Sequence, residues 1–269
     1  MNAIKGFFNF FRDIVKNRSI LWGLAKNDLK SRYASSLLGS CWTFVHPLST
    51  ILVLWFVFQV GLRSADVGDA PFIMWFIPAF LSWNYFAETF TGVTGSLREY
   101  SYLVRKVNFR VSIIPLVKII SGAFVHMAFI VFIFVMNAYY QRPLRLENLQ
   151  VFYYFFCMVV LLMGTGWLMA AITPFVNDVQ SIVAVLVQVG FWATPITWNP
   201  DMMSGPVQMV LKLNPMYYVC RGYRDAFVDY VWFWDRGFTN IYFWCVTLVI
   251  FVLGAYTFKK LRPQFADVL

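Results

Sequence analysis

Stretches that contain no Asp, Glu, Lys or Arg limit this chain's fold more than any other feature. They cover residues 33–62, 70–87, 119–141, 148–177, 179–200 and 237–258. An α-helix rises about 1.5 Å per residue, so about 20 apolar residues cross the ~30 Å hydrocarbon core of a bilayer. Each stretch reaches or nearly reaches that length, and none alternates as a membrane β-strand does. We therefore predict an all-α polytopic membrane protein with six transmembrane helices.

The charges that remain are unevenly placed between the predicted spans. Three segments carry an excess of basic over acidic residues: seven against two in 1–32, four against one in 96–112, and three against one in 259–269. The other loops, 63–69, 142–147 and 201–236, together hold seven of each sign. Because Lys and Arg are retained on the cytoplasmic side, both termini are predicted to be cytoplasmic. The net charge of +9 then reflects topology, and nucleic acid is not expected as a partner.

The pattern predicts a single transmembrane domain over residues 1–269. Residues 1–32 are expected to form cytoplasmic helices in the membrane interface, because residues 1–16 place apolar and charged side chains on opposite helical faces. Spans one to five occupy 33–194, and span six with a cytoplasmic tail occupies 237–269. The segment 195–236 is external, aromatic and interrupted by four prolines, so we expect a re-entrant helical hairpin with a helix starting at Asn214-Pro215.

Two ionisable residues, Glu88 and Lys118, lie inside predicted spans near the cytoplasmic side. Glu88 precedes the inner loop by eight residues and Lys118 follows it by six, which places both at a similar depth. Unpaired charges are costly in lipid, so we predict an intramembrane Glu88–Lys118 pair, with a structural clasp favoured over a substrate role.

The cytoplasmic loop 96–112 mixes basic and apolar residues and is predicted to present them to a partner. The residues concerned are Arg98, Leu103, Val104, Arg105, Lys106, Phe109 and Arg110. On the outer side, aromatic residues and one arginine gather in and beside the re-entrant segment, either at a gate or as anchors in the membrane interface. These are Trp192, Trp198, Tyr217, Tyr218, Tyr223 and Arg224.

Motifs for chemistry are missing from the sequence. No Gly-Lys pair occurs, so the usual phosphate-binding loop of an ATPase is excluded. The four cysteines have no short metal-binding spacing, and the two histidines are 80 positions apart. We expect no catalytic residues, no metal site and no cofactor in this chain.

Several motifs in this order resemble the type 2 ATP-binding-cassette permeases that export polysaccharides. They are "RYASSLLGSCWTFVHP", "FVNDVQS", "ATPITW" and "LNPMYYVCRGYRDAF". Within that group, the last of these and the closing "FKKLRPQFADVL" look most like the permeases that export wall teichoic acid, although O-antigen permeases share the same plan.

The resemblance implies a homodimer with two copies of a separate ATPase subunit, which would bind ATP and Mg²⁺, in a bacterial plasma membrane. The cargo would be a polymer on undecaprenyl diphosphate, either wall teichoic acid or, as the alternative, O-antigen or another polysaccharide. The diphosphate would then be received at Lys30, Arg32 and Tyr33, and the ATPase would contact the N-terminal helix and the 96–112 loop. Two rival interpretations are an ATP-independent channel and an enzyme acting on lipid-linked sugars. A channel or secondary transporter would need mid-membrane charges or inverted repeats, and the sequence shows neither clearly. An enzyme would need a cluster of carboxylates or His residues, which the sequence does not show.

Overall fold

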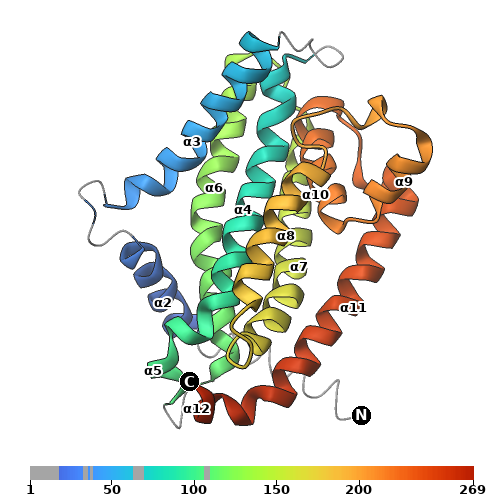
Figure 1. Cartoon of the computed structure of the whole chain (residues 1–269). Coiled ribbons are helices and arrows are strands. Elements are labelled where there is room, and N and C mark those ends of the chain that lie inside the picture. Colours follow the sequence, from blue (N-terminus) through green and yellow to red (C-terminus); the bar gives the residue numbers. More distant parts are fainter. Residues whose placement is uncertain (1–17, 33–35, 37–38, 63–69, 106–109) are drawn as a thin grey trace.

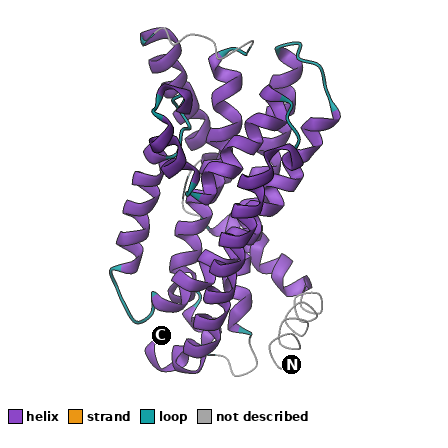
Figure 2. Cartoon of the chain, turned by 90° about the vertical axis from the view of Figure 1, so that its right-hand side faces the viewer, coloured by secondary structure: helices purple, strands orange, loops and turns teal. Residues whose placement is uncertain are grey.

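The computed structural model describes residues 18–32, 36, 39–62, 70–105 and 110–269. Every regular element within them is a helix, which confirms the predicted all-α class (Figure 2). The predicted amphipathic helix at 1–16 lies outside the described residues, as do Tyr33, Lys106 and Phe109 of the predicted sites.

Long helices form a bundle in which the chain runs alternately up and down (Figure 1). They are α3 (Trp42–Trp55), continued by the π-helix η2 (Phe56–Gly61), α4 (Phe72–Glu99), α6 (Ile114–Tyr139), α7 (Val151–Ile172), α8 (Val179–Ala193) and α11 (Gly237–Leu261). Short helices occupy the ends. Those at one end include α2 (Arg18–Ser31), α5 (Ser101–Val104), η3 (Val111–Ile113), η8 (Arg262–Gln264) and α12 (Phe265–Val268). Those at the other are η4 (Leu146–Gln150), η5 (Pro200–Met202), α9 (Gly205–Lys212), α10 (Pro215–Arg224), η6 (Asp225–Asp229) and η7 (Phe233–Arg236).

Four helical segments of the described chain are long and apolar enough to cross a membrane: Trp42–Gly61, Val111–Tyr139, Leu146–Ile172 and Phe233–Val268. The six-span count therefore remains a prediction for α4 and α8. The 15 residues of α8 span roughly 22 Å, less than the ~30 Å hydrocarbon core. The 28 residues of α4 are long enough, at roughly 42 Å, but less apolar.

The position of α4 explains its composition. It packs against α6, α7, α8 and α10, and its residues from Met74 to Trp83 are all buried. Because protein rather than lipid surrounds this stretch, polar atoms such as the Ser82 hydroxyl can be hydrogen-bonded internally, here to the Ala79 carbonyl at 2.8 Å. In contrast, α3 leans away from the bundle (Figure 1), and only 11% of the most apolar 18-residue stretch within Trp42–Gly61 is buried.

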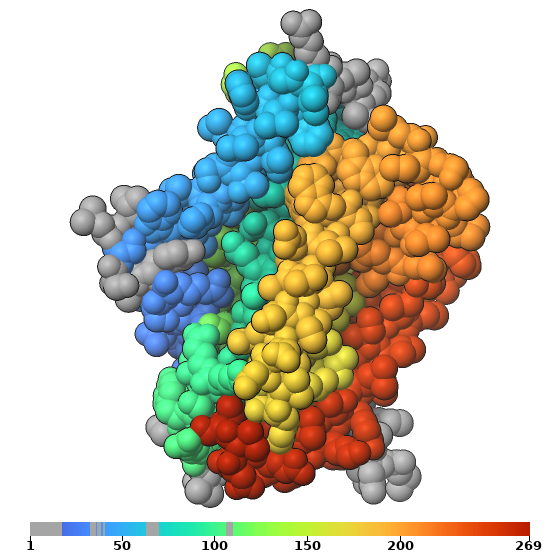
Figure 3. All heavy atoms as spheres, viewed as in Figure 1, coloured from blue at the N-terminus to red at the C-terminus, as the bar shows by residue number. Residues whose placement is uncertain are grey.

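The segment 195–236 contains a helix that begins where predicted. Asn214 caps α10, with its side-chain oxygen accepting the backbone N–H of Met216 at 3.0 Å, and Pro215 follows as the first helical residue. The helix then runs close to α7, since a Cβ added at Gly222 would overlap the ring of Tyr154. This contact fixes α10 against the bundle at the end opposite α2. On the face seen in Figure 3, α8 runs between α4 and α11.

Glycines bring α7 and α11 into backbone contact. A Cβ at Gly164 would lie 2.8 Å from the backbone of Phe251, and one at Gly254 would overlap the Gly164 carbonyl oxygen. Small residues allow such close approach between membrane helices, where van der Waals packing replaces the hydrophobic effect as the source of association.

We predict that Gly254→Ala lowers the stability of the detergent-solubilised protein by about 1 to 3 kcal/mol, the usual effect of overpacking, because the helices must separate. Thermal unfolding would measure this. The matched control is Gly23→Ala in α2, where an added Cβ meets nothing within 4 Å; there the higher helix propensity of Ala should leave stability unchanged or raised. Equal melting temperatures for Gly254→Ala and the parent would contradict the proposed contact.

Candidate functional site

The helix α2 joins the bundle through one buried face. Its buried residues are Leu21, Ala25 and Asp28, at the spacing that places side chains on one side of a helix. This face packs on α6. A carboxylate thus lies within an otherwise apolar contact, with a side chain that has 0% exposed surface. Such a group destabilises the fold unless partners supply opposite charge and hydrogen bonds.

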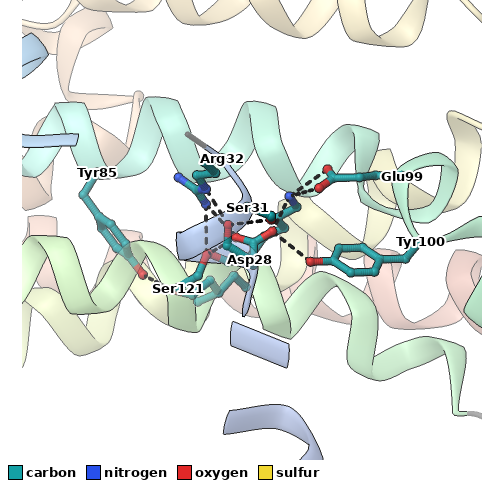
Figure 4. A network of polar contacts seen from close by, with 9 residues as sticks. Asp28, Ser31, Arg32, Tyr85, Glu99, Tyr100 and Ser121 are labelled. Carbon is teal, nitrogen blue, oxygen red and sulfur yellow. Dashed lines mark hydrogen bonds and ion pairs between the residues drawn. The ribbon is translucent and has the colours of Figure 1, made fainter. Parts of the chain in front are cut away.

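Four side chains supply those partners to Asp28 (Figure 4). Lys118 Nζ lies 2.5 Å from Oδ1, and the Tyr100 hydroxyl donates to the same oxygen at 2.9 Å. On Oδ2, Ser121 donates at 2.5 Å and Arg32 Nη2 at 3.1 Å. Burial alone would raise the pKa of Asp28, but the hydrogen bonds from Lys118 and Ser121 and the charges of Lys118 and Arg32 bring this pKa below its ordinary value.

Lys118 is the second buried charge of the cluster. Besides Asp28, its ammonium binds the carboxylate of Glu99 at 2.7 Å, and it lies 5.4 Å from the ring centre of Tyr100. Its side chain is 5% exposed, whereas that of Glu99 is 52% exposed. The cluster therefore extends from the buried α2–α6 contact to the surface at the end of α4, and joins three helices.

The predicted Glu88–Lys118 pair is wrong. Lys118 extends past Gly92 toward the end that carries α2, where a Cβ on Gly92 would lie 3.9 Å from its Cδ, and there it meets Asp28 and Glu99. Glu88 is exposed and accepts a hydrogen bond from Asn84. The prediction failed because α4 extends to Glu99, which provides a nearer carboxylate, and because nothing in the sequence places α2 beside α6.

The predicted diphosphate-binding residues have different surroundings. Lys30 is exposed at the end of α2. Arg32 uses Nε and Nη2 for Asp28, at 3.3 and 3.1 Å, and Nη2 also donates to Ser121 at 2.9 Å. Two of the guanidinium nitrogens of Arg32 thus help to hold α2 against α6, a role that the sequence did not indicate. The side chain is still 24% exposed.

Residues of the 96–112 loop connect distant parts of the end that carries α2 and α12. Arg98 Nη2 donates to the Thr173 carbonyl and to Asn177 Oδ1, each at 2.5 Å, which ties α4 to the α7–α8 turn. Arg105 Nη2 donates to the carbonyl of Leu269, at 2.5 Å. Leu103 and Val104 are buried, so they do not form an exposed apolar surface, and Arg110 has interacting neighbours of its own. Tyr102, 55% exposed, is the large side chain that α5 presents outward.

The outer residues divide into exposed and buried sets. Trp192 is 57% exposed, and Trp198 donates its indole N–H to the Trp192 carbonyl at 3.2 Å. Tyr217 is half-buried, whereas Tyr218 is buried and stacked on Phe243.

Tyr223 and Arg224 are buried and hold α10 in place. The Tyr223 hydroxyl is 2.7 Å from His126 Nε2 on α6. Arg224 lies over the Trp75 ring, 3.4 Å from its centre, and donates to the carbonyls of Trp75, Pro195 and Ile196 at 3.1, 2.7 and 2.7 Å. A guanidinium buried among carbonyl groups and an aromatic face connects the start of α4, the end of α8 and α10.

Comparison with known proteins assigns the family. The sequence matches the ABC-2 type transporter family over residues 20–228, which include most of α2, the Asp28 cluster and α10. The chain belongs to the ABC-2 type transporter family. It is therefore a transmembrane transporter subunit, and the resemblance seen in the sequence is confirmed at this level.

Curated relatives of this ABC-2 chain are polysaccharide permeases. It is 24% identical over 250 residues to the O-antigen export system permease protein RfbA of Klebsiella pneumoniae, covering 91% of this chain and 93% of that protein. It is 27% identical over 227 residues to the O-antigen export system permease protein RfbA of Myxococcus xanthus, covering 81% and 84%.

We predict that Asp28→Asn destabilises this ABC-2 chain by on the order of 3 kcal/mol, because it breaks a buried ion pair and leaves Lys118 with a partly exposed carboxylate alone. Combining it with Lys118→Met should cost less than the sum of the single changes, since the two groups interact directly. Asp235→Asn, at an exposed position, is the control and should leave the melting temperature unchanged. Additive effects of Asp28→Asn and Lys118→Met would contradict the pair.

Proposed function

We propose that this chain is the membrane subunit of an ATP-driven exporter that moves a lipid-linked polysaccharide of the O-antigen kind to the outer side of the membrane. The observation that carries the proposal is the similarity to O-antigen export permeases over most of both chains. It favours O-antigen or a related polysaccharide over wall teichoic acid, the cargo indicated by the closing segment and the α10 sequence.

The partners follow from the same proposal. A separate ATPase subunit, with its ATP and Mg²⁺, docks at the end that carries α2, α5 and α12, where Tyr102 is exposed and where Arg98 and Arg105 connect the loop to α8 and to the C-terminus. A second copy of the chain completes the pathway. The sparse burial of α3 supports this, because its apolar side chains face outward and are available to a neighbouring copy.

The uptake site lies at the cytoplasmic end of the first span. Undecaprenyl diphosphate would place its diphosphate at headgroup level, where exposed Lys30 and the free part of Arg32 supply positive charge. The Asp28 cluster holds α2 in register with α4 and α6, so movement at the ATPase-facing end can reach the residues that receive the cargo. The bacterial plasma membrane and cytoplasmic termini belong to this proposal.

We predict that depletion of this chain removes the polymer from the cell surface and leaves the lipid-linked polymer inside. Glycan staining of spheroplast and surface fractions would measure both pools. An enzyme acting on lipid-linked sugars would instead change the polymer's composition or length. Normal surface polymer in depleted cells would contradict export.

We further predict that Lys30→Gln reduces substrate-stimulated ATP hydrolysis by the reconstituted complex, because it removes a cation from the diphosphate site. Basal hydrolysis should persist. Lys26→Gln is the matched control, since Lys26 is an exposed lysine one turn away on the same helix, and its loss changes total charge equally. Equal stimulation in the parent and Lys30→Gln, or an equal reduction in Lys26→Gln, would remove the specific role of Lys30.

A further inference from the structure

A cavity of about 190 Å³ is lined by residues of α9, α10 and the start of α11. These helix segments lie at the end of the bundle opposite α2 (Figure 1). The walls of the cavity include Asp201, Gln208, Lys212, Tyr217, Arg221 and Arg236. It has room for one ring-sized group with several polar atoms.

A buried carboxylate fixes one wall of this cavity. Asp225, with 0% of its side chain exposed, accepts Arg236 Nη2 on Oδ1 at 2.7 Å and Arg236 Nε on Oδ2 at 2.8 Å. Arg221 Nε lies 3.3 Å from Oδ1, and Arg221 Nη2 reaches Asp229 at 2.9 Å. Both arginines keep about 30% of their side-chain surface exposed (29% and 31%). Their guanidinium planes are thus held in place, with N–H groups remaining for a ligand.

Charges around the cavity nearly cancel. The basic groups of Lys212, Arg221 and Arg236 are matched by Asp201 and Asp225 in the lining and by Asp229 behind Arg221. A strongly charged ligand such as a phosphate would gain little net attraction and would face the carboxylate of Asp201. Electrostatics therefore favour a neutral or weakly charged ligand.

The same cavity is lined by both hydrogen-bond donors and hydrogen-bond acceptors. Asp201 accepts, and so does the side-chain oxygen of Gln208, whose amide nitrogen is already bound to the Met203 carbonyl at 3.1 Å. Lys212 and the arginines donate, and Tyr217 adds an aromatic surface. A sugar hydroxyl both donates and accepts, and a sugar ring has an apolar face that packs on aromatic side chains.

We propose that this cavity binds one sugar residue of the polymer as it leaves the transporter. This inference rests on the proposed export function and adds to it a contact for the cargo on the outer side. Since a site of this size holds a single residue, the polymer can advance by exchanging one unit for the next.

Photo-crosslinking tests the site whatever the chemical identity of the sugar. The photoreactive residue p-benzoylphenylalanine would replace Gln208 or Lys212, one at a time, in full-length protein in cells that synthesise the polymer. Leu146, 71% exposed at the same end of the bundle, is the matched control position. After irradiation, the tagged chain is purified under denaturing conditions and stained for carbohydrate and for protein.

We expect a carbohydrate-bearing adduct at both cavity positions, absent at Leu146 and absent in cells that do not synthesise the polymer. Tyr217→Ala should remove most of the adduct formed from position 212 while chain abundance stays constant. Surface polymer measured in the same cells separates the two hypotheses. If export depends on the chain but neither position gives an adduct, the sugar site is overturned and the export function stands. If both positions crosslink to a second copy of the chain instead, the cavity is an interface and the sugar site is likewise overturned.

Discussion

The buried ion pair between Asp28 and Lys118 determines how the end of the bundle that carries α2, α5 and α12 is assembled. Each charge lies where an isolated ion would be strongly destabilising, so each requires the other, together with Tyr100, Ser121, Arg32 and Glu99. These groups come from α2, from α6 and from the end of α4. A displacement of any one helix breaks bonds made by the others, which makes the three move as a unit.

The opposite end uses a different arrangement for a similar purpose. Arg224 is buried among three carbonyl groups and the Trp75 ring, while Asp225, next in sequence, binds Arg221 and Arg236. As a result, Arg224 fixes one side of α10 to the bundle, whereas Arg221 on the same helix lines the cavity. The inner contacts fix the helix, and the outer ones arrange polar groups around a space open to a ligand.

Between the two ends of the bundle, α4 and α3 differ in how much of their surface other helices cover. The central helix α4 is surrounded by protein and carries aromatic and polar residues, whereas α3 remains mostly uncovered and is mostly apolar, without a charged residue. Proximity of α7 and α11 depends on Gly164 and Gly254, because any larger side chain would force their backbones apart.

The sequence by itself determined the helical class, the excess of basic residues in 1–32, 96–112 and 259–269, and the start of α10 at Asn214-Pro215, since charge-free length and capping residues act locally along the chain. It also supported the family resemblance through the order of its motifs. Only the tertiary structure decided that Lys118 binds Asp28, 90 positions away, instead of Glu88. It likewise decided that Arg32 holds α2 and that Leu103, Val104 and Arg224 are buried. Depth along a helix can be counted from sequence, but the direction of a side chain and its partner depend on which helices pack side by side, and that is settled by the packing of the whole bundle.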